Sequence, residues 1–369
     1  MDIPFVDLKA QYESLRPEID EAIQEVIEDT AFVRGPYVSQ FEKAYAEAFG
    51  VNHCISVANG TDAIYVVLQM LGIGPGDEVI TVANSWISTS ETIGQTGATP
   101  IFVDIERPYF NIDVEQIEDK INENTKAIIP VHIFGQPAKI DAIMEIANTY
   151  DLYVIEDTAQ SHFASYNNQF VGTYGTASTF SFYPGKNLGA YGDAGAILTN
   201  DDELARKCRM FSDHGASDKH THEIEGINSR LDGIQAAVLL TKLPHIQDWN
   251  QARCEHAQHY TNLLGTVDGI TPPPIRPNAS HVFHLYVIRV EEGRDELKGF
   301  LEQKGISTSI HYPKALPFLK AYADRDFEPS DFPVAHQYQS QILSLPIYPE
   351  MTKDMIEYVA MAIEDWVNK

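Results

Sequence analysis

The chain has little cysteine, and it contains no long apolar run. Only three cysteines occur in 369 residues; they are far apart, and none belongs to a C-x-x-C motif. Scattered cysteines in an odd number predict neither a disulfide framework nor a cysteine zinc site, and they are typical of a reduced cytoplasmic enzyme. No apolar stretch approaches the roughly 20 residues that a membrane helix needs, so we expect no membrane partner.

Basic residues are also scarce. Lysine and arginine total 26 against 53 aspartates and glutamates, which gives a formal net charge of −27. This balance argues against nucleic acid and anionic membranes as partners. The first 20 residues are acidic and lack the basic-then-apolar order of a secretory signal, so we expect a cytoplasmic protein. An anionic substrate would have to be met by local positive groups.

Short apolar runs alternate with helical patterns through the first two thirds of the chain. The runs lie at 54–58, 78–82, 101–105, 127–135, 152–157, 177–183 and 195–199. Helix-like segments such as 62–71 and 137–149 separate them. Continuous apolar strands alternating with helices predict an α/β fold, with a mostly parallel sheet covered on both faces. Ligands of such sheets bind at the carboxyl ends of the strands.

The two ends of the chain show other patterns of apolar residues. Residues 13–29 place apolar side chains, from Leu15 to Ile27, on one face of an amphipathic helix. After about residue 245 we expect a polar helix (246–264), a proline-rich turn (271–277), a strand (283–290), a helix (294–304), a strand near 307–311 and a final helix (352–368). We therefore predict a large domain over 1–245 and a smaller α+β domain over 246–369.

Lys186 lies in the segment FSFYPGKNLGAYGDAGAI, residues 180–197, between a β-rich apolar run and a glycine-rich turn. Lysine is rarely buried without a partner. Lys186 is therefore either a salt-bridged structural residue or a nucleophilic amine that reacts with a carbonyl group. Ser181, in the same segment, offers a hydroxyl.

NGTDAI (59–64) follows one predicted strand and opens a helix. Gly60 allows close approach of the backbone, and Thr61 lies in the first turn, where free N–H groups favour an anion such as phosphate. The alternative is ordinary N-capping by Asn59 or Thr61.

VIEDTAQSH (154–162) ends another strand in acidic residues. Asp157 at the carboxyl end of that strand would need a cationic partner, for which a protonated pyridine nitrogen is one candidate. The alternative is an N-cap for the next helix. Gln160 and His162 could contact a ring or a substrate, although a lone histidine is more often structural.

An amine, a phosphate-binding helix start and a strand-end aspartate are the three parts that a pyridoxal phosphate (PLP) site requires. Lys186 would form the Schiff base, Gly60 and Thr61 would hold the phosphate, and Asp157 would keep the pyridine nitrogen protonated. Trp86 follows the strand at 78–82 and could stack on the ring, or it could be a core residue.

Two further patterns are interpreted as structural. GIGPG (72–76) resembles a dinucleotide loop, but a proline removes an amide and a strand follows, so we predict a turn. His214, His220 and His222 lie in a polar stretch without regular ligand spacing. We expect no metal site there, but a mobile loop near the active site.

Nine segments, in order along nearly the whole chain, resemble the DegT/StrS family of nucleotide-sugar aminotransferases. These are PLP enzymes of the aspartate-aminotransferase fold (fold type I). The segments are GPYVSQFE (35–42), NGTDAI (59–64), GPGDEVI (74–80), TKAIIPVHIFG (125–135), VIEDTAQSH (154–162), FSFYPGKNLGAYGDAGAI (180–197), GINSRLDGIQAA (226–237), HLYVIR (284–289) and IHYP (310–313).

The resemblance implies a role for each matching residue. Lys186 is the Schiff-base lysine and proton shuttle, Asp157 pairs with the pyridine nitrogen, and Gln160 lies by the ring. Gly60, Thr61 and Ser181 hold the phosphate, and Trp86 takes the stacking position. Asn228 would reach the phosphate of the neighbouring subunit, which makes a homodimer with shared active sites the functional unit. Arg230, His311 and Tyr312 would line the sugar pocket, with His214 nearby.

The resemblance also implies the reaction. L-Glutamate would give its amino group to PLP and leave as 2-oxoglutarate, and the resulting pyridoxamine phosphate would aminate a nucleotide-linked keto-sugar. We expect amination at sugar carbon 3, for surface-polysaccharide (O-antigen or capsule) or related glycoside biosynthesis. The alternatives are a 4-keto substrate, an amino-acid aminotransferase or sugar dehydratase on the same fold, and a non-catalytic PLP-binding regulator. The dehydratase branch of the family has histidine at the Schiff-base position, so Lys186 argues against it.

Overall fold

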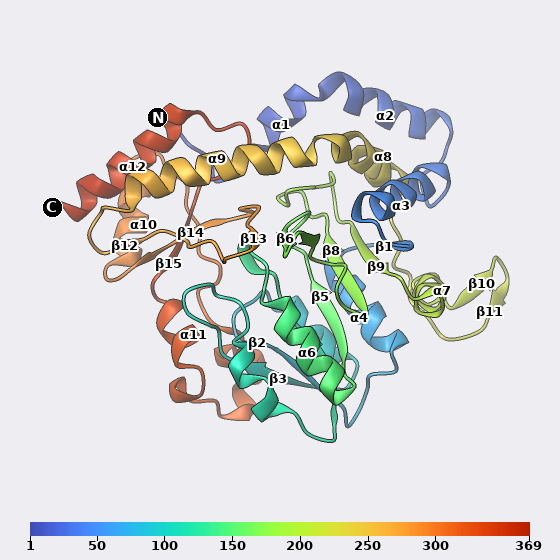
Figure 1. Cartoon of the computed structure of the whole chain (residues 1–369). Helices are drawn as coiled ribbons and strands as arrows, with labels where there is room; N and C mark the ends of the chain where they lie inside the picture. Colours follow the sequence, from blue (N-terminus) through green and yellow to red (C-terminus); the bar gives the residue numbers. More distant parts are fainter.

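A seven-stranded sheet forms the centre of the molecule in the computed structural model, which describes all residues 1–369 (Figure 1). In spatial order its strands are β1 (His53–Val57), β9 (Gly195–Thr199), β8 (Ala177–Ser181), β5 (Tyr153–Asp157), β4 (Thr125–Ile129), β2 (Glu78–Val82) and β3 (Thr99–Val103). The five strands from β8 to β3 pair in parallel, whereas β9 is antiparallel to both of its neighbours. The predicted, mostly parallel α/β sheet is confirmed.

Helices cover both faces of this sheet. One face packs on α4 (Gly60–Met70), α5 (Ser88–Gln95) and α7 (Asp202–Phe211), and the other on α3 (Pro36–Phe49), α6 (Ile140–Tyr150) and α8 (Gly233–Lys242). Strand β4 illustrates the division, because Ala127 and Ile129 join the core with α4 while Ile128 joins the core with α6. Both faces are buried, which explains why the strands are apolar without alternation.

A second core lies at the C-terminal end of the chain. The strands β12 (Ile270–Thr271), β14 (Tyr286–Val290) and β15 (Ile342–Leu345) form a three-stranded sheet, and α9 (Ile246–Leu264), α10 (Arg294–Gln303) and α12 (Lys353–Val367) pack with it. In Figure 1 the long helix α9 reaches from α8 to this region. The division at 245/246 stays a proposal, since Ile3 is buried in the second core and α11 (Pro333–Tyr338) packs on the first.

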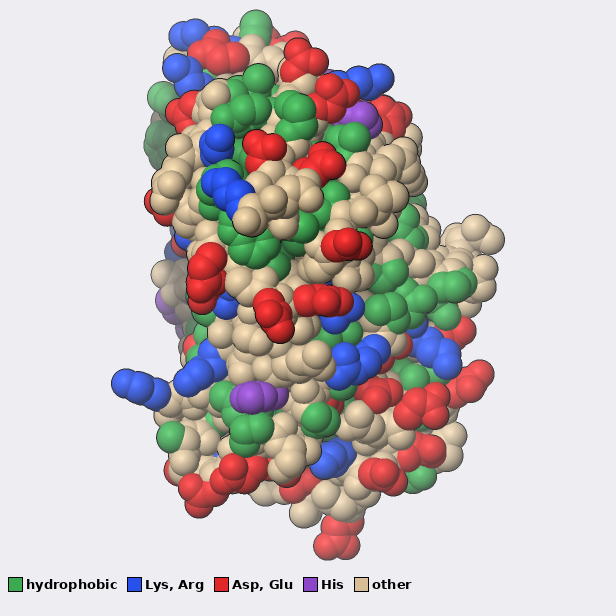
Figure 2. Space-filling model, turned by 90° about the vertical axis from the view of Figure 1, so that its left-hand side faces the viewer, with side chains coloured by type: hydrophobic (Ala, Val, Ile, Leu, Met, Phe, Trp, Pro, Cys, Tyr) green, Lys and Arg blue, Asp and Glu red, His purple; other side chains and the backbone are tan.

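The remaining elements are short. A small sheet consists of β6 (Ser165–Tyr166), β7 (Gln169–Phe170) and β13 (Ala279–Ser280), and a hairpin consists of β10 (Ala216–Asp218) and β11 (Thr221–His222). The segment 72–76 is a turn, as predicted. No helix combines the length and apolar character needed to cross a bilayer. On the face that Figure 2 shows, acidic side chains are spread among basic ones and form no single patch.

Two local predictions were wrong. The expected helix 13–29 is divided into α1 (Leu8–Ser14) and α2 (Arg16–Glu28) at Leu15, whose φ of −121° is not helical and which is followed two residues later by a proline. Ile27 is 45% exposed, not buried. The strand expected near 307–311 is only a bridge between Ser309 and Ser344, because the backbone then turns towards the cavity that the next residues line.

Candidate active site

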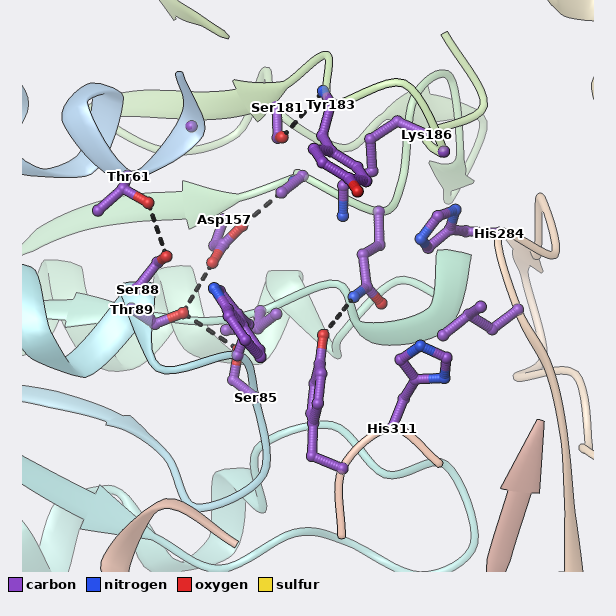
Figure 3. A pocket seen from close by; sticks show the side chains of 18 of the residues that line it. Thr61, Ser85, Ser88, Thr89, Asp157, Ser181, Tyr183, Lys186, His284 and His311 are labelled. Carbon is purple, nitrogen blue, oxygen red and sulfur yellow. Dashed lines mark hydrogen bonds between the residues drawn. The ribbon is translucent and has the colours of Figure 1, made fainter. Parts of the chain in front are cut away.

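A cavity of about 660 Å³ opens at the carboxyl ends of the central strands. Its wall combines the start of α4, the ends of β5 and β8, the loop after β2 and C-terminal segments (Figure 3). Of the residues selected from the sequence, those on the wall are Gly60, Thr61, Trp86, Asp157, Gln160, Ser181, Lys186, His311 and Tyr312. They come from positions 60 to 312, so the fold brings together residues that are distant along the chain.

Lys186 projects into the cavity from the loop that follows β8, where its backbone N–H donates to the carbonyl of Tyr183 (2.8 Å). Its ammonium group forms no ion pair. Burial lowers the pKa of Lys186 to about 8, and the opposing effect of the Asp157 charge is smaller. A lysine with a lowered pKa and no salt bridge fits the alternative of a nucleophilic amine better than that of a structural cation.

The start of α4 forms a compact polar cradle. The Asn59 side chain accepts from the N–H of Asp62 (2.8 Å), so Asn59 does cap the helix. The capping leaves the first-turn amides of Gly60 and Thr61 without an intrahelical acceptor. The hydroxyl groups of Thr61 and Ser88 lie 2.7 Å apart. Capping by Asn59 is therefore compatible with the predicted binding of a phosphate at this helix start.

Gly60 allows β8 to approach this cradle closely. A Cβ atom at position 60 would lie 2.8 Å from the Cβ of Ser181 and 3.2 Å from its Cα. We therefore expect Gly60→Ala to push α4 and β8 apart and to weaken PLP binding at least tenfold, with little change in the overall fold. Titration of the cofactor-free protein with PLP, followed by absorbance, measures this effect. An unchanged affinity would contradict the proposed role of this close contact. Gly50→Ala provides a control for stability alone, because a Cβ at position 50 would meet no atom within 4 Å, although the φ of 71° would be strained.

Asp157 ends β5 on the cavity wall. One carboxylate oxygen accepts from the Thr89 hydroxyl (2.8 Å) and the other from the N–H of Ala159 (3.1 Å). The local bond to Ala159 resembles the capping alternative, but the side chain also faces the cavity. Burial raises the pKa of Asp157, while the Thr89 hydrogen bond opposes this shift. A buried carboxylate of this kind is stabilised by a cation in the cavity.

Gln160 and Tyr312 are joined across the cavity wall. The Gln160 amide donates to the Tyr312 hydroxyl (3.0 Å) and accepts from the N–H of Phe134 (2.7 Å). The Trp86 ring lies 5.6 Å from the Tyr312 ring, and 59% of the residue is exposed. The core-packing alternative for Trp86 is therefore wrong, and stacking on a bound ring stays a prediction.

Three of the residues to which the resemblance assigned a role lie outside this cavity. Asn228 and His214 are exposed, and Arg230 forms an ion pair with Asp213 at 3.3 Å. His214 precedes the β10–β11 hairpin, which projects from the body of the molecule in Figure 1. Within a single chain, none of the three contributes to the wall around Lys186.

His162 is a structural residue. Its ring bonds the Tyr45 hydroxyl and the carbonyl of Ser181, both at 2.9 Å, within a cluster of buried aromatic side chains. Burial lowers the pKa of His162 to about 3, so the ring is neutral. It supports the strand that carries Ser181 and has no access to the cavity.

Several wall residues were not selected from the sequence. Ser88 and Thr89 follow β2, and a polar run after a buried strand was a usable signal for them. Arg253 and His284 also line the wall, but they come from the C-terminal half, and no local pattern marks them as site residues.

These residues fit PLP. Gly60, Thr61 and Ser181 line the cavity together at the start of α4, where free amides favour a phosphate. Asp157 offers a buried carboxylate, and Lys186 offers an amine with a lowered pKa. PLP supplies an electron sink for reactions at an amine-bearing carbon.

Comparisons with known proteins agree with this geometry. Residues 13–364 match the DegT/DnrJ/EryC1/StrS aminotransferase family. The chain belongs to this family. Its members are PLP-dependent aminotransferases.

Similar proteins cover almost the whole chain. A "Pleiotropic regulatory protein" of Geobacillus stearothermophilus is 45% identical (99% of each chain). The dTDP-3-amino-3,4,6-trideoxy-alpha-D-glucose transaminase of Streptomyces venezuelae is 40% identical (100% of this chain, 97% of the relative). The UDP-2-acetamido-2-deoxy-3-oxo-D-glucuronate aminotransferase of Pseudomonas aeruginosa is 41% identical (98% and 99%). The crystal structure of S. venezuelae DesV superposes with a TM-score of 0.97 at 40% identity, covering 100% of this chain and 99% of that one.

Proposed function

We propose that the enzyme transfers the amino group of L-glutamate to carbon 3 of a nucleotide-linked 3-keto sugar. The observation that carries this proposal is the cavity in which Lys186, Asp157 and the Gly60 cradle face one another. The relatives from S. venezuelae and P. aeruginosa have names that place the amino or oxo group at carbon 3, which supports that position. The product would serve polysaccharide or other glycoside biosynthesis in the cytoplasm, where the three free cysteines would remain reduced.

Each residue of the cavity wall has its own role in this proposal. With PLP bound, Lys186 would act as the base that takes the proton from the α-carbon of the amino donor and as the acid that gives it back, and it would carry out the reverse transfers with the sugar. Its lowered pKa suits this role, because proton transfer is efficient when the pKa lies near the working pH and contributes about 10²–10⁴-fold. Asp157 balances the positive charge of the ring nitrogen. Gln160 holds Tyr312 at the side of the cavity, next to His311.

We further propose a homodimer with shared active sites. Asn228 is exposed and Arg230 lies outside the cavity of its own chain, which fits residues that serve the phosphate and the sugar of a neighbouring subunit. His214 lies close to both along the chain. In this proposal the sugar pocket combines His311 and Tyr312 of one subunit with Arg230 of the other.

Mixing two variants, each of which we expect to be inactive alone, tests the shared site. Lys186→Ala removes the amine, and Asn228→Ala removes the side chain proposed to reach across. After the subunits are mixed and exchanged, heterodimers contain one site with both native residues, so we expect activity to return to at least about a tenth of the native value. Activity after exchange is the measurement. If mixing restores nothing although heterodimers form, Asn228 serves its own chain.

One observation favours a second function: the name of the G. stearothermophilus relative describes regulation. A regulator would need to bind PLP but not to process an amino donor. The presence of Lys186 with Asp157 favours catalysis in this chain, and Lys186 also argues against dehydration.

Absorbance of the bound cofactor tests the proposal. Adding glutamate to the PLP-loaded enzyme should decrease the visible band, and adding a nucleotide-linked 3-keto sugar should restore it. A protein that binds PLP but never loses the band with any amino donor is not an aminotransferase.

A further inference from the structure

Arg253, on α9, is a buried cation without a carboxylate partner. The residue is 4% exposed and lines the cavity. Its Nη1 donates to the backbone carbonyls of Phe283 (3.3 Å) and Ile347 (2.8 Å), and its Nε is buried with no hydrogen-bond partner. Neutral carbonyls do not balance the charge of a guanidinium, and buried charges are ordinarily paired. Burial lowers the pKa of Arg253 and the charge of Glu350 raises it by a smaller amount, but Glu350 forms no ion pair with it. The guanidinium therefore keeps a donor without a partner.

Arg253 lies at the part of the cavity away from the phosphate cradle. Its partner Phe283 precedes His284, and Figure 3 shows His284 and His311 on the side of the cavity opposite Thr61 and Ser88. Lys186 lies close to His284 in this view. A phosphate in the cradle would thus leave the Arg253 end open for another group.

The histidines next to Arg253 do not supply positive charge. The Asn187 amide nitrogen donates to the Asn250 side-chain oxygen (2.8 Å) and to the carbonyl of Val282 (3.0 Å). Its oxygen therefore faces Nδ1 of His284 (3.1 Å), which must be the donor. Nε2 of His284 is then a bare acceptor. Burial lowers the pKa of His284, and it lowers that of His311 to about 4.

Arg253 and Lys186 are consequently the only lysine or arginine side chains on the cavity wall. Lys186 would be engaged by the cofactor and by proton transfer. Within its own chain, a substrate carboxylate would therefore find a permanent positive charge at Arg253.

We propose that Arg253 binds a carboxylate of the amino donor and so selects amino acids over neutral amines. This inference rests on the proposed function, because an amino donor must enter the same cavity. The Nε of Arg253 has no partner within the chain, and a guanidinium can donate two hydrogen bonds to a carboxylate.

Binding of glutarate to the PLP-loaded enzyme tests this role without catalysis. Glutarate has the carboxylates of glutamate but no amine, so its dissociation constant, measured by calorimetry, does not depend on turnover. We expect Arg253→Gln to weaken glutarate about 10- to 100-fold, the range for a lost hydrogen bond to a charged group. The KM for glutamate should rise similarly, and Arg253→Lys should recover part of the loss.

Arg294→Gln is the matched control. Arg294 is also buried and donates to the carbonyls of Gln339 and Ile342, but it forms an ion pair with Asp295 (2.7 Å) and lies outside the cavity. The Arg294→Gln variant should have a lower free energy of unfolding and an unchanged dissociation constant for glutarate. If Arg253→Gln does not fold, Arg253→Lys is compared with Arg294→Lys in the same assay. The inference then requires that the dissociation constant of glutarate rise at least about threefold in Arg253→Lys and stay unchanged in Arg294→Lys.

Two results would overturn the inference. One is native glutarate affinity in a folded Arg253→Gln. The other is a selective loss of nucleoside diphosphate binding, which would assign Arg253 to the sugar nucleotide. The decrease of the visible band on adding glutamate to the native enzyme separately tests the proposed function, so the two failures can be distinguished.

Discussion

Lys186→Ala should abolish transamination in both directions while leaving the protein folded. The variant loses the only amine in the cavity, and with it proton transfer, so we expect the rate of each half-reaction to decrease by at least about 10²–10⁴-fold. The cofactor should still bind in the cradle of α4, because Gly60, Thr61 and Ser181 are unchanged. Stopped-flow absorbance with glutamate measures the first half-reaction directly.

Lys242→Gln is the matched control for this variant. Lys242 is another fully buried lysine; burial also lowers its pKa to about 8, but its ammonium group donates to the carbonyl of Gly189 outside the cavity. The Lys242→Gln variant should have a lower free energy of unfolding but transfer protons through Lys186 at the native rate. A Lys186→Ala variant that retains more than about a tenth of the native rate would contradict the assignment of the proton shuttle.

Asp157→Ala should produce the second-largest loss. Removing one partner of a buried ion pair leaves the other charge unpaired, at a cost of about 3–5 kcal/mol, or roughly 10²–10⁴-fold in rate if the full cost falls on the transition state. The ring nitrogen would no longer be held as a cation, so the visible absorption of the bound cofactor should also change. Single-turnover rates and spectra test both effects.

Two milder variants, one at Asp157 and one at its partner Thr89, separate the effect of the negative charge from that of the hydrogen bonds. Asp157→Asn can still accept from Thr89 and Ala159, so it removes the charge and keeps the local hydrogen bonds. It should be almost as slow as Asp157→Ala. Thr89→Val removes one hydrogen bond and should cost about tenfold or less. If Asp157→Asn retained the native rate, the carboxylate would serve only to hold the loop.

The central sheet was predictable because its pattern is local. Strands buried on both faces are continuous apolar runs, and β2 and β9 were located at their observed bounds. The break at Leu15 was missed, and β15 was not predicted, since neither is marked by periodicity alone. The chain at 307–311 was predicted as a strand from its residues, but its backbone leaves the sheet to bring His311 and Tyr312 to the cavity.

The candidate site was predictable where chemistry follows a strand. Asp157, Gly60 and Lys186 all lie next to strand ends, so their convergence follows from the parallel sheet. Arg253 could not be found in this way, because it is one of several polar residues on an otherwise ordinary helix. Its lack of a carboxylate partner appears only when the tertiary structure brings α9 to the cavity wall.

Amination of a nucleotide-linked sugar at carbon 3 can be tested directly. The PLP-loaded enzyme is given glutamate together with a synthetic 3-keto or 4-keto nucleotide sugar, in parallel reactions. Mass spectrometry and NMR of the products locate the new nitrogen. We predict formation of the 3-amino sugar together with an equal amount of 2-oxoglutarate, and turnover of the 4-keto compound alone would contradict the claim.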